Sequence, residues 1–244
     1  MPTLLLDIGN TRTKVAATVS GNLILLNKNN RPITRSQIKN WIAKYKLTHL
    51  FAANVNEHHQ PVLDISASLL FAKPWNNKLR MPYENLYRSN TLGQDRMAMV
   101  AAASLKFLNQ NSLIISCGTC ITYDFLNAQN QYCGGAISPG LKMRFNALHL
   151  MTARLPLIKA GKLTALSGAT TIESIQSGVF RGIIGELSYQ ILSYQKKYHQ
   201  LNIVITGGDA HHFIPHLNCK IFAVDNLVLQ GLQQILQHNF PDIV

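Results

Sequence analysis

The sequence has little charge, and acidic charge is the scarcest. Of its 244 residues only 14% are charged, 11 of them acidic and 23 basic, which leaves a formal net charge of +12. Hydrophobic residues make up 47% of the chain. This composition argues against intrinsic disorder and supplies a hydrophobic core for one large domain or two smaller ones.

Runs of basic residues are also missing, in spite of the positive net charge. The densest cluster is the pair Lys196-Lys197, and no run of five or more basic residues occurs. There is no helix-turn-helix signature, zinc-finger spacing or aromatic RNA-binding pattern. The scattered charge disfavours nucleic acid as a partner, and it fits a solvated basic surface that attracts an anionic small molecule.

Long apolar runs are absent as well. No apolar stretch approaches the roughly 20 residues of a membrane span. The apolar run near the N-terminus has no preceding basic segment and breaks at Asp7, so we expect no signal peptide. The chain has four cysteines and too much core to need a disulfide framework. We therefore expect a cytoplasmic protein with reduced thiols and no membrane partner.

One pattern of strands and turns occurs twice along the chain. In each copy a short buried strand ends in a glycine turn, and a hairpin strand and a third strand follow. The predicted strands span residues 3–7, 13–19 and 23–26 in the first copy and 113–116, 121–126 and 131–137 in the second. Helical spacing predicts helices at 35–45, 61–71, 94–108, 141–151, 171–198 and 227–239.

This internal repeat predicts an α/β fold built from two similar halves that face each other across a cleft. Hairpin-linked strands at the start of each half favour mixed sheets flanked by helices over purely parallel ones. No linker rich in serine or proline separates the halves. We place them at residues 1–105 and 106–244, with the boundary near the predicted helix at 94–108.

The first glycine turn combines an acid, basic residues and hydrogen-bond donors. It reads Asp7, Ile8, Gly9, Asn10, Thr11, Arg12, Thr13 and Lys14. Gly9 permits a tight turn whose N–H groups converge on an anion. Asp7 is placed to hold Mg²⁺ and Lys14 to reach a phosphate, although the Gly-x4-Gly-Lys-[Ser/Thr] loop is absent. The alternative, an ordinary hairpin with a solvated aspartate, is disfavoured by the second copy.

The second glycine turn repeats the glycine without the acid. It reads Ser116, Cys117, Gly118, Thr119 and Cys120. Gly118 and Thr119 again offer a phosphate-facing turn. Gly207 and Gly208 follow a later buried strand and permit the flat adenosine part of a nucleotide to lie close to the backbone. The two cysteines have C-x-x-C spacing, for which small buried residues are favoured over a zinc or redox site.

A third motif opens the predicted helix at 94–108. It reads Gly93, Gln94, Asp95 and Arg96. An aspartate at a helix N-terminus is favoured by the helix dipole, which is one interpretation of Asp95. The other is a general base that accepts the hydroxyl proton in phosphoryl transfer, beside an arginine that orients an anionic substrate.

Together these motifs strongly resemble the type III pantothenate kinase family. The set is Asp7 to Lys14, Gly93-x-Asp95-Arg96, Gly118-Thr119, Gly134-Gly135-x-Ile137-x-Pro139-Gly140 and Gly207-Gly208-Asp209-Ala210. The motifs come in the family's order and cover nearly the whole chain. Any one of them is only moderately specific, whereas the ordered set is highly specific.

The resemblance implies a duplicated actin/hexokinase-like fold with ribonuclease H-like halves. It implies ATP-dependent phosphorylation of pantothenate, the first step of coenzyme A synthesis, with Asp95 as catalytic base. Residues 7–14 would form the first phosphate loop and Thr119 would touch ATP from the second. Residues 93–96 would line the pantothenate site, and Thr171 matches the family's substrate-binding threonine. Family members are homodimers with the substrate site near the subunit interface, and they use Mg²⁺ and a monovalent cation, K⁺ or NH₄⁺.

Two positions depart from the family pattern. Ser116 stands where the family usually has an aspartate of the monovalent-cation site, so a neutral oxygen replaces a charge. Tyr87 resembles the family's pantothenate-contacting tyrosine, but its distance to Gly93 is one residue shorter than the family spacing.

Two other functions remain open at the level of sequence. One is a non-catalytic regulatory or transcription-accessory protein on the same scaffold, and the intact Asp7, Lys14 and Asp95 disfavour it. The other is an actin-like kinase or phosphatase that acts on a different substrate, such as a sugar or exopolyphosphate. The motif at residues 93–96 disfavours this second alternative.

Overall fold

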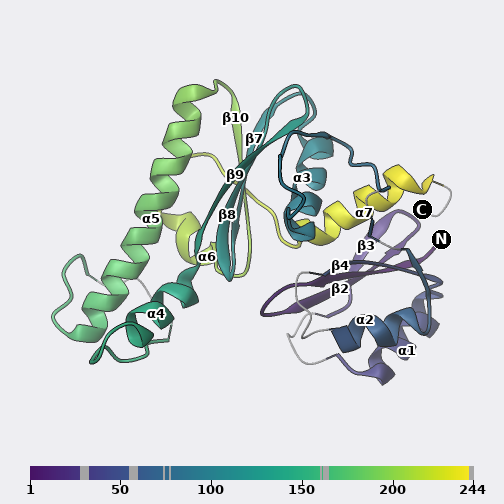
Figure 1. Ribbon diagram of the computed structural model, residues 1–244, viewed down its shortest axis with the longest axis horizontal. Coiled ribbons are helices and arrows are strands. Elements are labelled where there is room, and N and C mark those ends of the chain that lie inside the picture. Colours follow the sequence, from purple (N-terminus) through teal and green to yellow (C-terminus); the bar gives the residue numbers. More distant parts are fainter. Residues whose placement is uncertain are drawn as a thin grey trace. The chain divides into compact units, whose positions relative to one another are not determined.

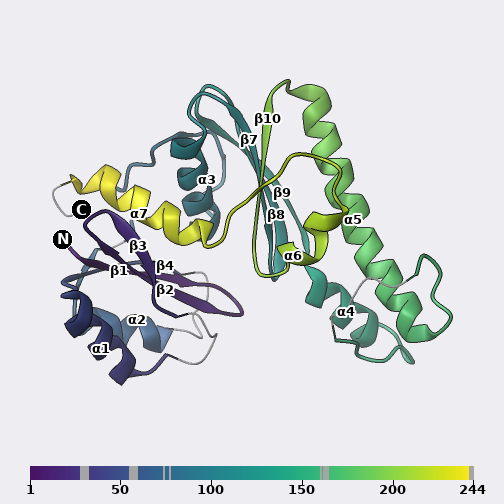
Figure 2. The ribbon, with the colours of Figure 1, turned by 180° about the vertical axis from the view of Figure 1, so that it is seen from behind.

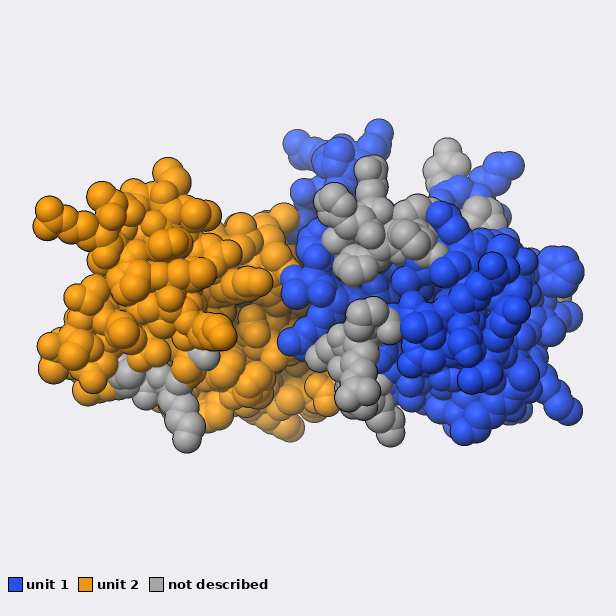
Figure 3. Space-filling model, turned by 90° about the horizontal axis from the view of Figure 1, so that it is seen from below, with its two compact units in different colours: residues 1–109, 130–133, 226–244 blue, residues 110–129, 134–225 orange. Residues whose placement is uncertain are grey.

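The computed structural model describes residues 1–27, 33–54, 60–73, 75–76, 78–159, 161 and 165–241. They form two compact units, shown in different colours in Figure 3. Unit 1 comprises residues 1–109, 130–133 and 226–244, and unit 2 comprises residues 110–129 and 134–225. Within the described ranges, no helix combines the length and the apolar character that crossing a bilayer requires.

Unit 1 contains a five-stranded mixed sheet with the strand order β3-β2-β1-β4-β5 (Figure 1). The strands are β1 (Thr3–Ile8), β2 (Thr13–Val19), β3 (Asn22–Leu25), β4 (His49–Asn54) and β5 (Phe71–Lys73). β1 pairs antiparallel with β2 and parallel with β4. Hairpins thus build one side of the sheet, and helical crossovers build the other.

The described residues of unit 1 form four α-helices. They are α1 (Arg35–Tyr45), α2 (Gln60–Ala67), α3 (Gln94–Lys106) and α7 (Leu227–Asn239). α1 turns Ile38, Trp41 and Ile42 toward the apolar side chains of β1 and β2. α3 and α7 pack against each other, and α7 contacts β1, β2 and β4. The sheet is therefore covered by helices, and β1 is buried apart from Asp7, which is half-buried.

Unit 2 repeats this plan with the strand order β11-β10-β7-β8-β9, and β6 (Glu84–Asn85) extends that sheet beside β9. Figure 2 labels β7, β8, β9 and β10. The strands of unit 2 are β7 (Asn111–Cys117), β8 (Cys120–Leu126), β9 (Gln131–Pro139), β10 (Leu201–Thr206) and β11 (Phe222–Ala223). Its helices are α4 (Leu141–Leu150), α5 (Thr171–Lys197), α6 (Ala210–Phe213) and the 3-10 helix η2 (Ile214–His216). The two-residue strand β6 (Glu84–Asn85) pairs with the first residues of β9, which belong to unit 1.

The long helix α5 provides the core of unit 2. It begins with a capping box in which Thr170 and Glu173 satisfy each other's backbone N–H groups. Seven of its residues are buried, among them Phe180, Ile183 and Leu187. They form one cluster with apolar side chains of β7, β8 and β10.

The two sheets have the same strand order when β7 is matched to β1 and the rest follow in sequence. The predicted fold class, a duplicated α/β fold with mixed sheets and flanking helices, is therefore confirmed. The boundary at 105/106 stays a prediction about the repeat. The division into compact units uses a different criterion from the internal repeat, and it assigns α7 to unit 1.

Candidate active site

The first glycine turn joins β1 to β2 in unit 1. Asp7 lies directly opposite Lys14 in the antiparallel register, and Ile8 lies opposite Thr13. Residues 9–12 form the loop, which is closed by a hydrogen bond of 3.0 Å from the Gly9 N–H to the carbonyl of Arg12. Asn10, Thr11 and Arg12 are exposed at its tip. The turn thus presents one carboxylate and one ammonium group side by side, with polar side chains ahead of them.

Asp7 has an unusual electrostatic environment. Burial near the end of β1 raises its pKa, the positive charge of Lys14 opposes this, and the negative charge of Asp95 adds to the rise; the net pKa is about 6. A carboxylate near another carboxylate resists ionisation unless a cation compensates. Asp95 therefore lies near enough to Asp7 for their charges to interact within unit 1, and a cation bound at Asp7 would offset both burial and this repulsion.

Thr13 adds a second sign of a missing partner. Its hydroxyl is buried and has no hydrogen-bond partner among the described residues. Buried polar groups are normally satisfied by protein, water or ligand. Thr13 pairs with Ile8, however, so its hydroxyl lies on the opposite face of the sheet from the Asp7–Lys14 pair and does not join their site.

Asp95 lies in the first turn of α3, where its geometry depends on Gly93. The Oδ1 atom of Asp95 accepts a hydrogen bond of 2.8 Å from the backbone N–H of Arg96. A Cβ added at Gly93 would come within 2.5 Å of that oxygen, so a side chain there would displace the carboxylate. Gln94 follows as the first residue of the helix. The motif thus holds the carboxylate at the helix N-terminus.

Arg96 is buried beside two tyrosines of the same unit. Its Nη2 donates a hydrogen bond of 2.9 Å to the hydroxyl of Tyr132, and its guanidinium lies 5.7 Å from the ring centroid of Tyr87. The rings of Tyr87 and Tyr132 stack at 6.0 Å. Tyr132 was missed at the sequence level, because a tyrosine in a strand carries no signal that it will meet an arginine 36 residues away.

The second glycine turn joins β7 to β8 in unit 2, and backbone contacts hold it on both sides. The Gly118 N–H donates to the carbonyl of Cys120 at 3.0 Å. The Gly140 N–H donates to the carbonyl of Thr119 at 3.1 Å, and the Asp209 N–H to that of Cys117 at 3.0 Å. Thr119 is exposed at the tip. The loop is one residue shorter than the first, because Cys117 pairs with Ile121.

Gly207 and Gly208 follow β10 beside the second turn. Gly207 has a φ of +103°, which side-chain-bearing residues rarely adopt, and a Cβ there would lie 2.2 Å from the carbonyl oxygen of Cys117. Gly208 is exposed. Glycine is therefore required at 207 for the strand ends to meet, and Gly208 leaves bare backbone open to a ligand.

Ser116 belongs to a row of hydroxyl residues across the second sheet. It pairs with Thr122 on β8 and with Thr206 on β10. Paired residues of neighbouring strands point to the same face of a sheet. Thr122 also donates a hydrogen bond of 3.3 Å to the buried Asp124. This face offers neutral oxygens at Ser116, with a carboxylate two residues along β8.

The C-x-x-C pair does not have the properties of a reactive site. Burial and, to a smaller extent, the negative charges of Asp209 and Glu186 together raise the pKa of Cys117 to about 12. The thiol therefore stays protonated at neutral pH, whereas nucleophiles and metal ligands need the thiolate. In the described part of the chain no group of three or more histidine, cysteine or acidic residues is arranged to hold a metal.

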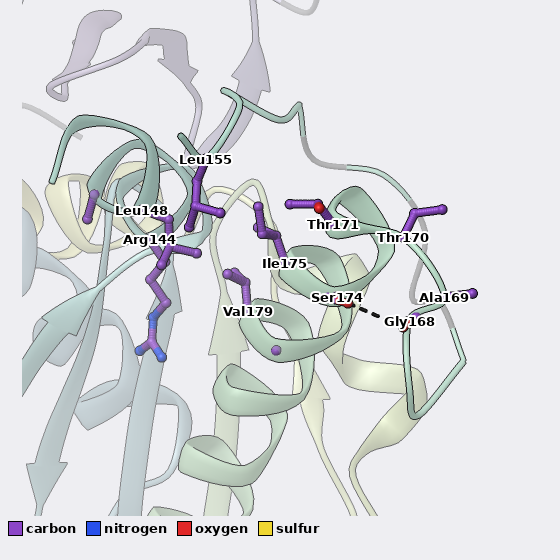
Figure 4. Close-up of a pocket in the computed structure, with 12 residues that line it drawn as sticks. Arg144, Leu148, Leu155, Gly168, Ala169, Thr170, Thr171, Ser174, Ile175 and Val179 are labelled. Atoms are coloured by element: carbon purple, nitrogen blue, oxygen red, sulfur yellow. Dashed lines mark hydrogen bonds between the residues drawn. The ribbon is translucent and has the colours of Figure 1, made fainter. Parts of the chain in front are cut away.

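Thr171 lies at the start of α5, in the wall of a pocket of about 880 Å³. Figure 4 shows Ile175 and Val179 of α5 facing Leu148 of α4 across this pocket. The guanidinium of Arg144 extends away from these apolar side chains. The pocket is mainly apolar at its centre and polar at the N-terminus of α5.

The predicted site residues thus fall into two groups. Unit 1 brings together residues 7–14, Tyr87 and residues 93–96, and it couples Asp7 to Asp95. Unit 2 brings together Ser116, Thr119 and the Gly207-Gly208 loop. Thr171 lies apart from that loop, on the wall of the α4–α5 pocket.

Comparisons with known proteins identify the family of the chain. The family model described as type III pantothenate kinase matches residues 3–193. A type III pantothenate kinase of Flavobacterium johnsoniae is 37% identical over 98% of this chain and 99% of its own length. One from Bacteroides fragilis is 38% identical over 97% and 98%. A solved structure from Campylobacter jejuni, described as a Baf family transcriptional activator, has a TM-score of 0.59 at 21% identity and covers 98% of this chain and 99% of its own; it shows the fold alone.

Proposed function

Because the chain belongs to the type III pantothenate kinase family, we propose how its residues share the reaction of that family. The enzyme transfers a phosphoryl group from ATP to pantothenate and forms 4′-phosphopantothenate. This is the first step of coenzyme A biosynthesis. Phosphoryl transfer requires that the two substrates be positioned, that phosphate charge be neutralised and that the hydroxyl proton be accepted.

The observation that carries the proposal is the electrostatic coupling between Asp95 and the first glycine turn. The charge of Asp95 raises the pKa of Asp7, so both carboxylates act on one region. We assign the general base to Asp95, which accepts the proton of the pantothenate hydroxyl as its oxygen attacks the γ-phosphorus of ATP. Arg96, oriented by Tyr132 and Tyr87, is the partner for the substrate carboxylate.

The residues of the first turn fit a divalent cation. Burial raises the pKa of Asp7, so its carboxylate is stabilised in the ionised form by a nearby positive charge. We assign Mg²⁺ to Asp7, directly or through water. When bound, the ion neutralises phosphate charge. Lys14 and the backbone of residues 10–12 bind the phosphates beside it.

The second turn carries no charged side chain, and we propose that it binds the nucleotide through neutral groups. We assign Thr119 to the phosphates, and Gly207 and Gly208 to the adenosine part of ATP. A monovalent cation, K⁺ or NH₄⁺, fits the hydroxyl row at Ser116 and Thr122, because neutral oxygens suffice for a singly charged ion. The buried Asp124 is the nearest source of negative charge on that face.

We propose that the enzyme is a homodimer and that Thr171 acts near the subunit interface. Large apolar side chains are exposed around α4 and the beginning of α5, and such patches mark interaction surfaces. They are Met143, Leu150, Met151, Leu157, Leu166 and Ile172. Light scattering on the purified protein measures the mass and tests this. A cytoplasmic location fits an ATP-dependent biosynthetic enzyme with free cysteines.

The test of function is ADP release, measured chromatographically with pantothenate, ATP and Mg²⁺. Release should depend on pantothenate, and Asp95→Asn should lower kcat by about 10²- to 10⁴-fold with ATP binding retained. Asp64→Asn, an exposed aspartate on α2, is the matched control and should behave as wild type. Full activity of Asp95→Asn would refute the assignment of the base. Salt-dependent DNA binding without any kinase activity would instead support a regulatory protein.

A further inference from the structure

Glu186, in the middle of α5, is the centre of a hydrogen-bond network in unit 2. Its Oε1 accepts a hydrogen bond of 2.7 Å from the Tyr123 hydroxyl and one of 2.5 Å from Ser138 Oγ. Its Oε2 pairs with Nη2 of Arg144. The donors come from β8, β9 and α4. Glu186 therefore ties three separate elements to the long helix.

Arg144 extends this network to the backbone before α4. Its Nε donates a hydrogen bond of 2.8 Å to the carbonyl of Pro139, the last residue of β9. The backbone N–H of Arg144 donates a hydrogen bond of 3.1 Å to the carbonyl of Gly140. The pair with Glu186 thus sets where the backbone passes from β9 into α4.

The backbone at Gly140 lies directly against the second glycine turn. The Gly140 N–H donates to the carbonyl of Thr119, and a Cβ at position 140 would lie 2.1 Å from the carbonyl oxygen of Gly118. Contacts this close leave the turn no freedom to move independently. A displacement of Pro139 or Gly140 must therefore displace Gly118 and Thr119 as well.

We propose that the Glu186–Arg144 pair positions the second glycine turn for ATP. Glu186 and Arg144 are then positioning residues, because they reach the nucleotide only through Pro139, Gly140 and Thr119. The inference rests on the proposed assignment of that turn to ATP, and it adds two residues that no motif contains.

The chemistry of the pair fits positioning better than stability alone. The two side chains retain only 22% and 24% of their exposure, so forming the pair removes both charges from most of their water. A partly buried ion pair is weak evidence for stability, whereas it holds geometry well when its hydrogen bonds are satisfied. Here each oxygen of Glu186 has a donor.

The test compares three variants by the KM for ATP, the KM for pantothenate and the Kd of a fluorescent ATP analogue. Glu186→Gln should raise the KM for ATP and the analogue Kd about tenfold, as expected for a lost charge-assisted hydrogen bond, and leave the KM for pantothenate within twofold. Arg144→Lys keeps the charge but loses the Nε bond to Pro139, and should have a similar effect. Tyr123→Phe removes one donor and should raise both values only two- to threefold, which keeps the test available if Glu186→Gln fails to fold.

Ile191→Val, a buried residue further along α5, is the control for loss of stability alone. It should lower the melting temperature without changing the KM for ATP. Glu186→Gln and Arg144→Lys variants that melt early but bind the analogue like wild type would overturn the proposal. The analogue separates this proposal from the proposed function. If the wild-type protein binds the analogue but does not phosphorylate pantothenate, weaker analogue binding by Glu186→Gln still supports the positioning role. If the wild-type protein binds no analogue, the positioning proposal is overturned.

Discussion

The two glycine turns occupy equivalent places in the two sheets, yet they differ in charge. In unit 1, the penultimate residue of β1, Asp7, lies opposite Lys14. In unit 2, the matching positions are Ser116 and Thr122. The first turn is therefore charged, and the second is neutral and presents hydroxyls and backbone groups.

This difference shows that the duplication repeats a backbone but not its chemistry. The same strand order brings a glycine turn to the end of the first strand in both units. Asp7 is desolvated and has a raised pKa, so it favours a compensating cation. The second turn is instead locked by contacts at Gly140 and Gly207. We interpret the first turn as the one that binds the metal and the phosphate charge, and the second as a rigid support for the nucleotide.

Of the substitutions in the two turns, Asp7→Asn should have the largest effect. Loss of the carboxylate should lower kcat by about 10²- to 10³-fold, comparable to the loss of other charge-stabilising groups. The same variant should unfold at a higher temperature than wild type at pH 7.5 without Mg²⁺. The folded pKa of Asp7 is about 6 against 3.8 for the unconstrained group, so ionisation destabilises the folded state as pH rises through that interval. Steady-state kinetics and calorimetry measure the two effects. A fall in both activity and melting temperature would contradict the electrostatic account.

The second turn should respond to steric change instead of charge. Gly140→Ala places a Cβ against the carbonyl oxygens of Gly118 and Thr119, at 2.1 and 2.4 Å, so the backbone must shift. We expect the KM for ATP to rise about tenfold and the free energy of unfolding to fall by about 1–3 kcal/mol. Gly185→Ala is the matched control, because it lies on α5 with no atom within 4 Å of the added carbon. Equal KM values for the two variants would show that the close contact at Gly140 is unimportant for ATP.

A charge introduced at Ser116 should make the two turns more alike. Ser116→Asp places a carboxylate on the face that already carries Asp124, and a monovalent cation would relieve their repulsion. The K⁺ concentration for half-maximal activity should fall about fivefold, or about 1 kcal/mol. Titration of ADP release with K⁺, NH₄⁺ and Na⁺ measures this. An unchanged response to all three cations would place the monovalent site elsewhere.

The smallest effect concerns acid stability. Burial alone would raise the pKa of Glu186, but hydrogen bonds from Ser138, Arg144 and Tyr123 together lower it. A lowered folded pKa means that Glu186 stabilises the fold above its ordinary value of 4.5 and loses that contribution as pH falls. Glu186→Gln should therefore be less stable than wild type by about 1 kcal/mol at pH 7, and the difference should shrink below pH 4.5. Urea unfolding of both proteins at pH 7 and below pH 4.5 measures this difference in stability. A difference that does not change with pH would contradict the stabilising role of ionised Glu186.

The local spacing of apolar residues predicted much of the fold, because several helices and strands bury one regular row of apolar side chains. The strand Thr13–Val19 and the helix Leu227–Asn239 match the sequence prediction at both ends. The helix predicted at 61–71 was too long, since α2 ends at Ala67 and Phe71 begins β5. A three-residue strand with an exposed Phe71 has almost no pattern of its own, and its pairing with β4 decides its structure.

The parts of the candidate site that contain glycine motifs could be predicted from the sequence. The parts formed by residues far apart along the chain could not. The turns and the motif at residues 93–96 are local signals. The three donors to Glu186 lie 42, 48 and 63 residues away from it along the chain, so no spacing could indicate the network. The stacking of Tyr87 on Tyr132 likewise depends on the fold.

The most direct test of the unequal turns is the Mg²⁺ dependence of ATP binding, measured by isothermal titration calorimetry. Asp7→Asn and Ser116→Ala are compared with wild type, each with and without Mg²⁺. We predict that Mg²⁺ strengthens ATP binding to wild type and to Ser116→Ala by similar factors and leaves Asp7→Asn unchanged. Loss of the Mg²⁺ effect in Ser116→Ala, with its retention in Asp7→Asn, would contradict the assignment of the metal to the first turn.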